Sequence, residues 1–183
     1  IGCLSVCMSL YAQEENIQIS DSLFIKHKYG LRVGVDASKL VRTFLETDYS
    51  AIEFNADYRF TDRLYIAAEI GNEERTTSTD YLNSTAKGTY LKAGIDYNMY
   101  DNWAGMENMV YSGLRFGISN FNQTLNSYTI YDTNNSTWGQ TEVLEGENFK
   151  DLSATWLELV FGFKAEVINN LFVGINVQIK GRL

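Results

Sequence analysis

The chain has 183 residues, no proline and a formal net charge of −8. This length supports one domain with a substantial buried core, and the lack of proline permits long uninterrupted strands. The acidic balance argues against a nucleic-acid partner, because binding phosphates requires a basic surface. No apolar run approaches the 18 residues of a transmembrane helix.

Residues 1–13 are uncharged and mostly small or apolar. They are interpreted as the remnant of a signal peptide, followed by an N-terminal lead over residues 14–29. Two alternatives stay open: a lipobox ending at Cys7, where Val6 is large for that position, and an N-terminal strand of the mature fold. Cys3 and Cys7 are the only cysteines, so a mature chain without them would have no disulfide and no thiolate metal site.

From Gly30 onward apolar and polar residues alternate, which is the period of a β-strand. Most of the alternating segments have the 9 to 11 residues, roughly, with which a tilted strand crosses a bilayer. The pattern predicts seven strands: Gly30–Asp36, Ser50–Phe60, Leu64–Gly71, Tyr90–Asn98, Val110–Ser119, Trp156–Val167 and Leu171–Lys180.

The connections between these strands alternate between shorter and longer ones. Tight turns follow the second and sixth strands, the latter at Asn169-Asn170, a pair that favours hairpins. A medium turn covers 99–109. This alternation predicts an all-β, antiparallel, up-and-down transmembrane-type β-barrel over residues 30–183, with short turns on the periplasmic side and long loops outside. The predicted long loops are 37–49, 72–89 and 120–155.

Seven strands are an odd number, whereas bacterial single-chain barrels have an even one. The last residues, 180–183, contain no aromatic strand end. We therefore expect eight or ten strands in the full-length protein, with at least one C-terminal strand beyond this sequence. Residues 16–19 are a shorter candidate for an additional strand.

The glycines indicate which face of the strands points inward. Glycine weakens a strand, but inside a narrow barrel side chains converge and small residues make room. The polar face is therefore predicted to line the lumen and the apolar face to meet lipid. The glycines that share the parity of the charged residues are Gly30, Gly34, Gly71, Gly94, Gly113, Gly117, Gly162 and Gly174.

Charged residues on the same face form a nearly neutral set of seven acids and six bases. Buried charges are tolerable only when they are paired and hydrogen-bonded, so we expect a lumen plugged by ion pairs. The members are Arg32, Asp36, Glu53, Asp57, Arg59, Glu69, Lys92, Asp96, Arg115, Glu158, Lys164, Glu166 and Lys180.

Aromatic residues near strand ends would suit interfacial girdles, with ordinary strand packing as the equal alternative. They are Tyr49, Tyr58, Phe60, Tyr65, Tyr90, Tyr97, Tyr100, Trp103 and Trp156.

The chain carries no recognisable catalytic or cofactor-binding motif. Its one histidine, His27, lies between two lysines before the first strand and is interpreted as a solvated residue. No Ser-His-Asp set can be assembled without it, and GxSxG, P-loop and HExxH motifs are absent. The acids of 142–151 lack the spacing of an EF-hand loop. We therefore expect no enzyme activity, no metal and no cofactor.

The segment 120–155 is the best sequence candidate for a binding surface, because loops of this length are commonly functional or disordered. Tyr128 and Tyr131 with Trp138 could form a hairpin that binds a ligand or partner. A protective cap over the lumen is the equal alternative.

Four stretches, at 28–36, 92–98, 102–108 and 123–131, resemble an uncharacterised family from Bacteroidota. Its members are known as a domain of unknown function with a predicted outer-membrane barrel. The resemblance covers nearly the whole mature chain and implies a location in the cell envelope, without an activity, ligand or site residues.

Together these features predict a small, monomeric, non-enzymatic barrel in the bacterial outer membrane, exported by a signal peptide, with a structural or surface-binding role. Its partners would be outer-membrane lipid and an unidentified extracellular ligand or protein. The alternatives are a narrow channel, a soluble periplasmic barrel for a lipophilic ligand and an enzyme that uses His27.

Overall fold

The structure is a computed structural model that describes residues 7–9, 30–101, 107–130, 141–143 and 146–183. It is an all-β fold with one short helix, α1 (Ala37–Leu45). The strands are β1 (Cys7–Ser9), β2 (Leu31–Asp36), β3 (Tyr49–Arg59), β4 (Leu64–Ser78), β5 (Leu82–Asn98), β6 (Met109–Ile130), β7 (Thr141–Val143), β8 (Glu147–Ile168) and β9 (Leu171–Arg182).

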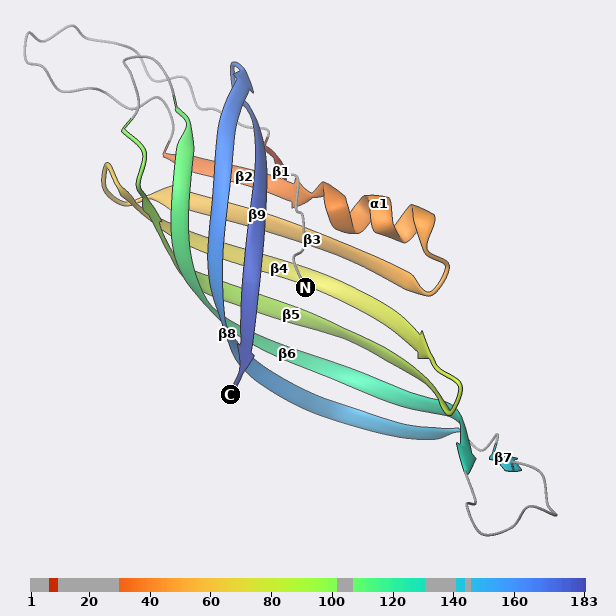
Figure 1. Cartoon of the computed structure of the whole chain (residues 1–183). Helices are drawn as coiled ribbons and strands as arrows, with labels where there is room; N and C mark the ends of the chain where they lie inside the picture. Colours follow the sequence, from red (N-terminus) through yellow and green to blue (C-terminus); the bar gives the residue numbers. More distant parts are fainter. Residues whose placement is uncertain (1–6, 10–29, 102–106, 131–140, 144–145) are drawn as a thin grey trace, which may run out of the picture.

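All strands belong to one antiparallel sheet, in which the seven long strands follow one another in chain order. The sheet curls into a half-barrel, so that β8 and β9 cross in front of the strands from β2 to β6 (Figure 1). Some Cα atoms of β1 lie within 8 Å of β9, but the pairing path through the described residues does not join these two strands. The predicted antiparallel all-β fold with seven strands is confirmed.

The short turns lie where the sequence places them. Phe60 donates its backbone N–H to the carbonyl of Leu64 at 2.9 Å and so closes the turn between β3 and β4. Asn170 has a φ of 71°, the left-handed conformation that asparagine tolerates in tight hairpins. These turns lie at one end of the half-barrel.

At the other end the strands are longer than predicted. Residues 72–89 are mostly strand, because β4 and β5 continue to a turn at 79–81, closed by a bond from Thr79 N–H to Leu82 O of 2.8 Å. Much of 120–155 likewise belongs to β6, β7 and β8. The loop prediction was wrong for these parts: they lack apolar alternation, but their β-branched threonines suit strands and pair across them, as Thr76 and Thr85 do through hydroxyls 2.9 Å apart.

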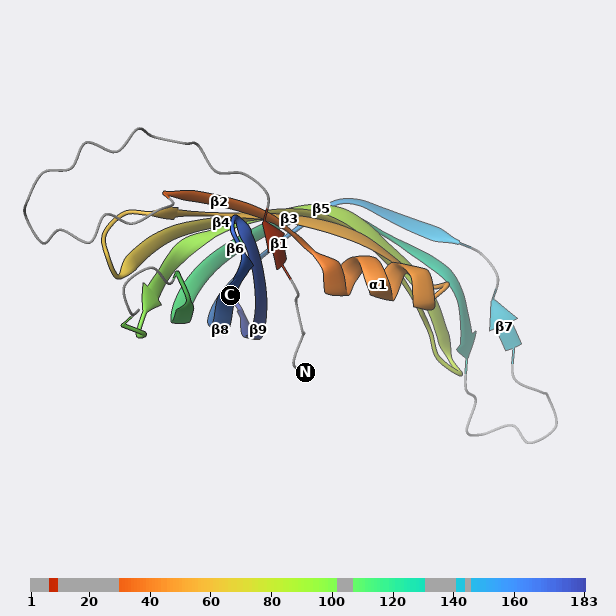
Figure 2. The same ribbon diagram turned by 90° about the horizontal axis from the view of Figure 1, so that it is seen from above.

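The connection predicted as a loop over 37–49 contains α1. Asp36 is its N-cap, and the Asp36 carboxylate accepts hydrogen bonds from the backbone N–H of Ser38 (2.8 Å) and Lys39 (3.4 Å). At the last turn Arg42 donates to the carboxylate of Glu46, and this bond lowers the pKa of Glu46. The helix lies on the concave side of the sheet, beside the part of the trough that β8 and β9 leave uncovered (Figure 2).

Three residues of the segment interpreted as a signal-peptide remnant form β1. They pair with the end of β2, with Cys7 opposite Asp36 and Ser9 opposite Gly34. No helix in the described part of the chain is long and apolar enough to span a membrane.

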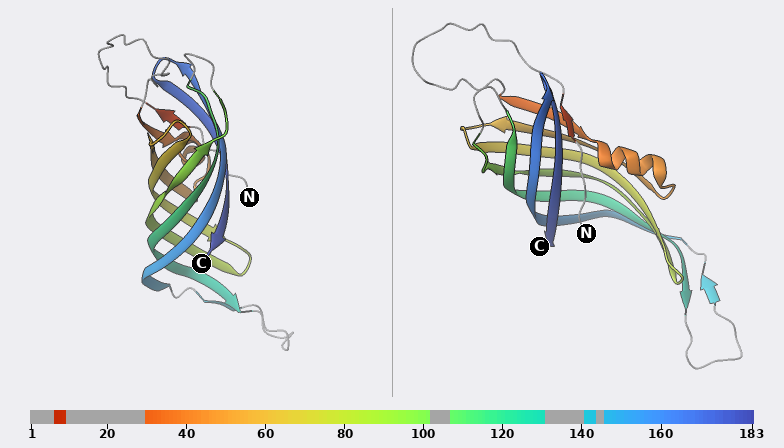
Figure 3. Two further views of the ribbon diagram at one scale, coloured as in Figure 1. Left: turned by 90° about the vertical axis from the view of Figure 1, so that its left-hand side faces the viewer. Right: turned by 45° about the horizontal axis from the view of Figure 1, so that its top comes forward.

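Along the strands, polar side chains are buried and apolar side chains are exposed, which is the reverse of a water-soluble barrel. In β3, for example, Glu53 and Asp57 are buried while Ile52 and Phe54 are exposed. The buried apolar core is small: Tyr65, Met109, Tyr111 and Val160 form one cluster. The interior of this half-barrel is therefore built mainly from polar side chains and glycine, and Figure 3 shows the strands wrapping around it.

Candidate functional site: a charged interior

Inward-facing residues of successive strands lie opposite one another and form a row across the seven long strands of the sheet. Arg32 is opposite Asp57, and Arg115 is opposite Glu158, so opposite charges are neighbours. Small residues separate the two charged groups and leave room for the long side chains. In strand order the row is Arg32, Asp57, Ala67, Gly94, Arg115, Glu158 and Lys180.

Lys92 is the centre of the larger cluster. Its ammonium group, almost fully buried, pairs with the carboxylates of Glu69, Glu53 (3.3 Å) and Glu158 (3.7 Å), which come from three other strands. Arg115 holds Asp96 with two parallel contacts of 2.7 and 2.8 Å and reaches Glu69 at 3.3 Å. Such bidentate, charge-assisted pairs are the geometry that makes buried ions tolerable.

A second cluster lies nearer the short turns. Asp57 accepts a hydrogen bond from the Nε of Arg32 at 2.6 Å and pairs with the ammonium of Lys164 at 2.5 Å. Because Asp57 is on β3 and Lys164 is on β8, this pair bridges strands that are not neighbours in the sheet. A cavity of about 20 Å³ beside them has room for about one water molecule. The ion pairs therefore fill the interior at this level.

The predicted interior set is largely brought together, with differences at three positions. Asp36 caps α1 through its contacts with Ser38 and Lys39. Glu166 is half-buried near the Asn169-Asn170 turn, where its carboxylate accepts the N–H of Asn170 at 3.3 Å. Lys180 keeps 54% of its side-chain surface exposed while pairing with Glu158 at 3.1 Å.

Sequence reasoning missed several members of the network. Lys39 reaches inward from α1 to Glu53 (3.0 Å) and to the hydroxyl of Tyr90. Glu107 pairs with Arg59, which also donates to Tyr65 at 2.9 Å. Lys39 and Glu107 lie in segments predicted as connections, so strand parity did not apply to them.

Three inward-facing aromatic rings lie against glycines of the neighbouring strand. A Cβ atom on Gly71 would come within 2.3 Å of Tyr90, one on Gly117 within 2.3 Å of Trp156, and one on Gly162 within 2.5 Å of Tyr111. Glycine is required there because the ring occupies the space of its missing side chain.

For four of the aromatic residues considered for the girdles, the structure favours the alternative of ordinary strand packing. Tyr49 and Tyr65 are buried, and Tyr90 and Trp156 are half-buried and inward-facing. Tyr90 shares the parity of Lys92, a signal that was readable in the sequence. The other described candidates, Tyr58, Phe60, Tyr97 and Tyr100, are exposed, and Trp103 lies outside the described residues.

The outer face carries an equally continuous row of apolar side chains. One residue from each long strand lies opposite the next, and each is between 47% and 59% exposed. Exposing such a continuous apolar surface to water is unfavourable, whereas transferring it to an apolar environment is favourable. The row is Leu31, Tyr58, Ile66, Ile95, Leu114, Leu159 and Ile179, hereafter the apolar belt.

The remaining sequence candidates are distributed as follows. Tyr128 lies within β6, opposite Leu82 and Val143, and is not part of a loop. His27, Tyr131 and Trp138 lie outside the described residues. Within the described ranges no group of three or more His, Cys, Asp or Glu side chains is arranged to hold a metal ion.

The chain matches a known protein family over residues 1–183, a domain of unknown function (DUF6048). No curated protein and no solved structure matches it. The chain therefore belongs to this family of domains of unknown function.

Proposed function

We propose that this member of the family is a β-barrel protein of the bacterial outer membrane, from Bacteroidota, with a structural or surface-binding role and no enzymatic activity. Its apolar belt faces lipid, its interior is sealed by ion pairs, and its extended strands project from the outer surface. Lipid and an extracellular ligand or protein are its partners, and it acts as a monomer.

The apolar belt is the observation that carries this proposal. Burying it against hydrocarbon would favour insertion by roughly 25 cal/mol for each Å² removed from water. A soluble barrel for a lipophilic ligand requires the reverse arrangement, with apolar residues inside. In this protein the inward positions hold Lys92, Asp96, Arg115 and Glu158, all buried.

The interior also favours a sealed barrel over a channel. The pairs Asp57–Lys164 and Lys92–Glu158 each connect non-neighbouring strands and so cross the space that a pore would need. Separating them without water would leave uncompensated charges, which is costly.

The strand lengths fit a barrel whose distal part stands outside the bilayer. A tilted strand crosses with about 9 to 11 residues, whereas β6 and β8 each have 22. The segments beyond the belt, such as 72–78 and 120–127, are rich in Thr, Asn, Ser and charged residues. This distal part of the sheet is the proposed surface-exposed part.

Insertion into lipid vesicles tests the proposal. The purified protein, refolded with phosphatidylcholine vesicles, should float with them and migrate differently on a detergent gel before and after boiling. Leu114→Arg should reduce the inserted fraction, because a charge near the bilayer midplane costs about 2–4 kcal/mol. Asn122→Arg, an exposed position beyond the belt on the same strand, is the matched control and should insert normally. A protein that stays folded and soluble without lipid would refute the proposal.

A further inference from the structure

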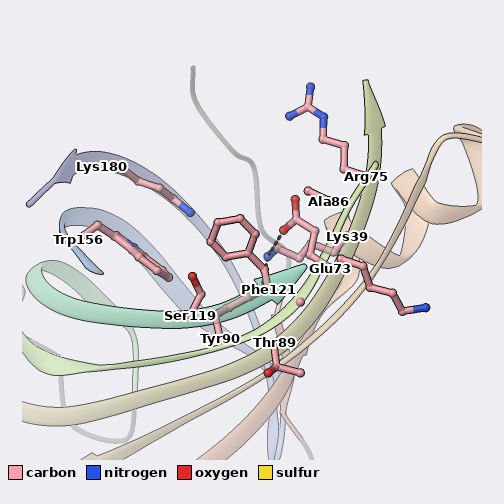
Figure 4. Close-up of a pocket in the computed structure, with 12 residues that line it drawn as sticks. Lys39, Glu73, Arg75, Ala86, Thr89, Tyr90, Ser119, Phe121, Trp156 and Lys180 are labelled. Atoms are coloured by element: carbon pink, nitrogen blue, oxygen red, sulfur yellow. Dashed lines mark hydrogen bonds and ion pairs between the residues drawn. The ribbon is translucent and has the colours of Figure 1, made fainter. Parts of the chain in front are cut away.

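A cavity of about 270 Å³ opens where α1 faces β8 and β9, above the ion pairs of the interior (Figure 4). Its volume is close to the lower limit for small-molecule sites. The side chains that line it come from α1 and five strands, and none of them belongs to the apolar belt.

Aromatic rings form one wall of this cavity. Tyr90, Phe121 and Trp156 line it from three successive neighbours in the sheet, β5, β6 and β8. The rings of Tyr90 and Trp156 stand against Gly71 and Gly117 of adjacent strands, and the Cβ of Phe121 lies against Gly88. The rings of Tyr90 and Trp156 meet edge-on with centroids 6.5 Å apart. These rings offer apolar faces, inclined to one another, on which a ligand ring can stack.

Basic groups lie around the rings. Four basic side chains and one acidic one, Glu73, line the cavity, although the chain as a whole is acidic. In Figure 4 the ammonium end of Lys180 points into the space between Trp156 and Phe121, and it pairs with the fully buried Glu158. An ammonium group has three donors, and the Lys180 side chain is 54% exposed. It can therefore also donate a hydrogen bond to an anion in the cavity.

Trp156 and Lys180 are both held by the same buried carboxylate. Its indole N–H donates to the carboxylate of Glu158 at 2.6 Å, and this carboxylate also holds Lys180. The aromatic wall and its cation are therefore fixed to each other by one buried acid. A preformed site of this kind loses little side-chain entropy when it binds.

We propose that this cavity binds a small organic anion that carries a flat apolar ring. The ring stacks on Trp156 and Phe121, and the anionic group pairs with Lys180. The ion pairs below close the inner end, so the ligand is retained rather than conducted. All the residues that line this site belong to the described part of the chain, and its failure would leave the proposed membrane location untouched.

Tryptophan fluorescence can test the site directly. In a Trp103→Phe/Trp138→Phe background, Trp156 is the only tryptophan. The probes are 4-nitrobenzoate and its uncharged analogue 4-nitrobenzamide, both of which quench indole emission. The benzoate should quench saturably, with an apparent affinity at least tenfold higher than that of the amide.

Two variants separate the charge from the stacking surface. Lys180→Gln should remove the tenfold preference for the anion, while Ser119→Phe, at a position that lines the cavity, should block both probes without removing an ion pair. Lys150→Gln, an exposed lysine outside the cavity, is the control and should behave like the parent. Folding of each variant is checked by its circular dichroism spectrum, which does not depend on the proposed membrane location. Equal, non-saturating quenching by the two probes, or unchanged binding in Lys180→Gln, overturns the proposal.

Discussion

In this protein charged side chains are buried and apolar side chains are exposed, and Arg115 is the most informative example. Its guanidinium group is 3% exposed and holds Asp96 and Glu69, from β5 and β4. Its chain neighbours Leu114 and Phe116 are exposed apolar residues. Adjacent positions of one strand thus serve opposite environments, as strand geometry requires.

Arg115→Leu should lower the free energy of unfolding by about 3–5 kcal/mol, because it leaves buried carboxylates without their cation. The measurement is urea-induced unfolding of the refolded protein, followed by tryptophan fluorescence. Arg63→Leu breaks an exposed pair with Asp101 and should cost at most about 1 kcal/mol. Equal stability of the two variants would contradict the buried network.

Gly117→Ala tests the packing of rings on glycine. A Cβ atom there would lie 2.3 Å from the Trp156 ring, so the ring must move, at a cost of about 1–3 kcal/mol. The Trp156 emission maximum should shift in the background without the other tryptophans. Gly181→Ala, whose new Cβ would have its nearest neighbour 4.0 Å away, should change neither stability nor emission. An unshifted emission maximum in Gly117→Ala would argue against this contact.

At the scale of elements, the sequence was informative wherever one face of a strand is apolar. The alternation of Ile52, Phe54 and Tyr58 with Glu53 and Asp57 predicts β3 and also predicts which side chains are buried. The glycine parity gives the same orientation. Both signals lie within the sequence of a single strand, so they can be recognised without knowing which strands are its neighbours.

The distal parts of the strands and α1 lacked that signal. From 72 to 78 both faces of β4 are polar, and the pairing that makes this segment a strand comes from β5 and is invisible to periodicity. For α1, a capping residue at Asp36 and apolar residues at 41, 44 and 45 do follow the helical period, but nine residues are a short stretch. Because Lys39 lies on this helix, its ion pairs in the interior could not be predicted either.

A disulfide can test the distal hairpin. In a background in which Cys3 and Cys7 are replaced by serine, Thr76→Cys with Thr85→Cys should cross-link, because these residues are opposite each other in β4 and β5. Thr76→Cys with Lys87→Cys is out of register and should not. Gel mobility with and without reductant gives the result. Equal cross-linking of both pairs would indicate a loop instead of a ladder.

At the scale of the whole molecule, sheet and helix follow the same plan. The polar face of each element turns inward, where the side chains of α1 such as Lys39 meet those of the sheet. The apolar side is left exposed, as for Phe44 on α1 at 86% and Ile70 on β4 at 56%. In the proposed membrane location, hydrocarbon would cover the apolar side, while the ion pairs keep the buried charges of the interior compensated.

The most direct test of this account measures what surrounds the apolar belt. Spin labels attached through Leu114→Cys, Ile118→Cys and Asn122→Cys, in the background without native cysteines and in lipid vesicles, report collisions with oxygen and with a water-soluble nickel chelate. The account predicts high oxygen and low nickel accessibility at 114 and 118, and the reverse at 122. High nickel accessibility at all three positions would contradict it.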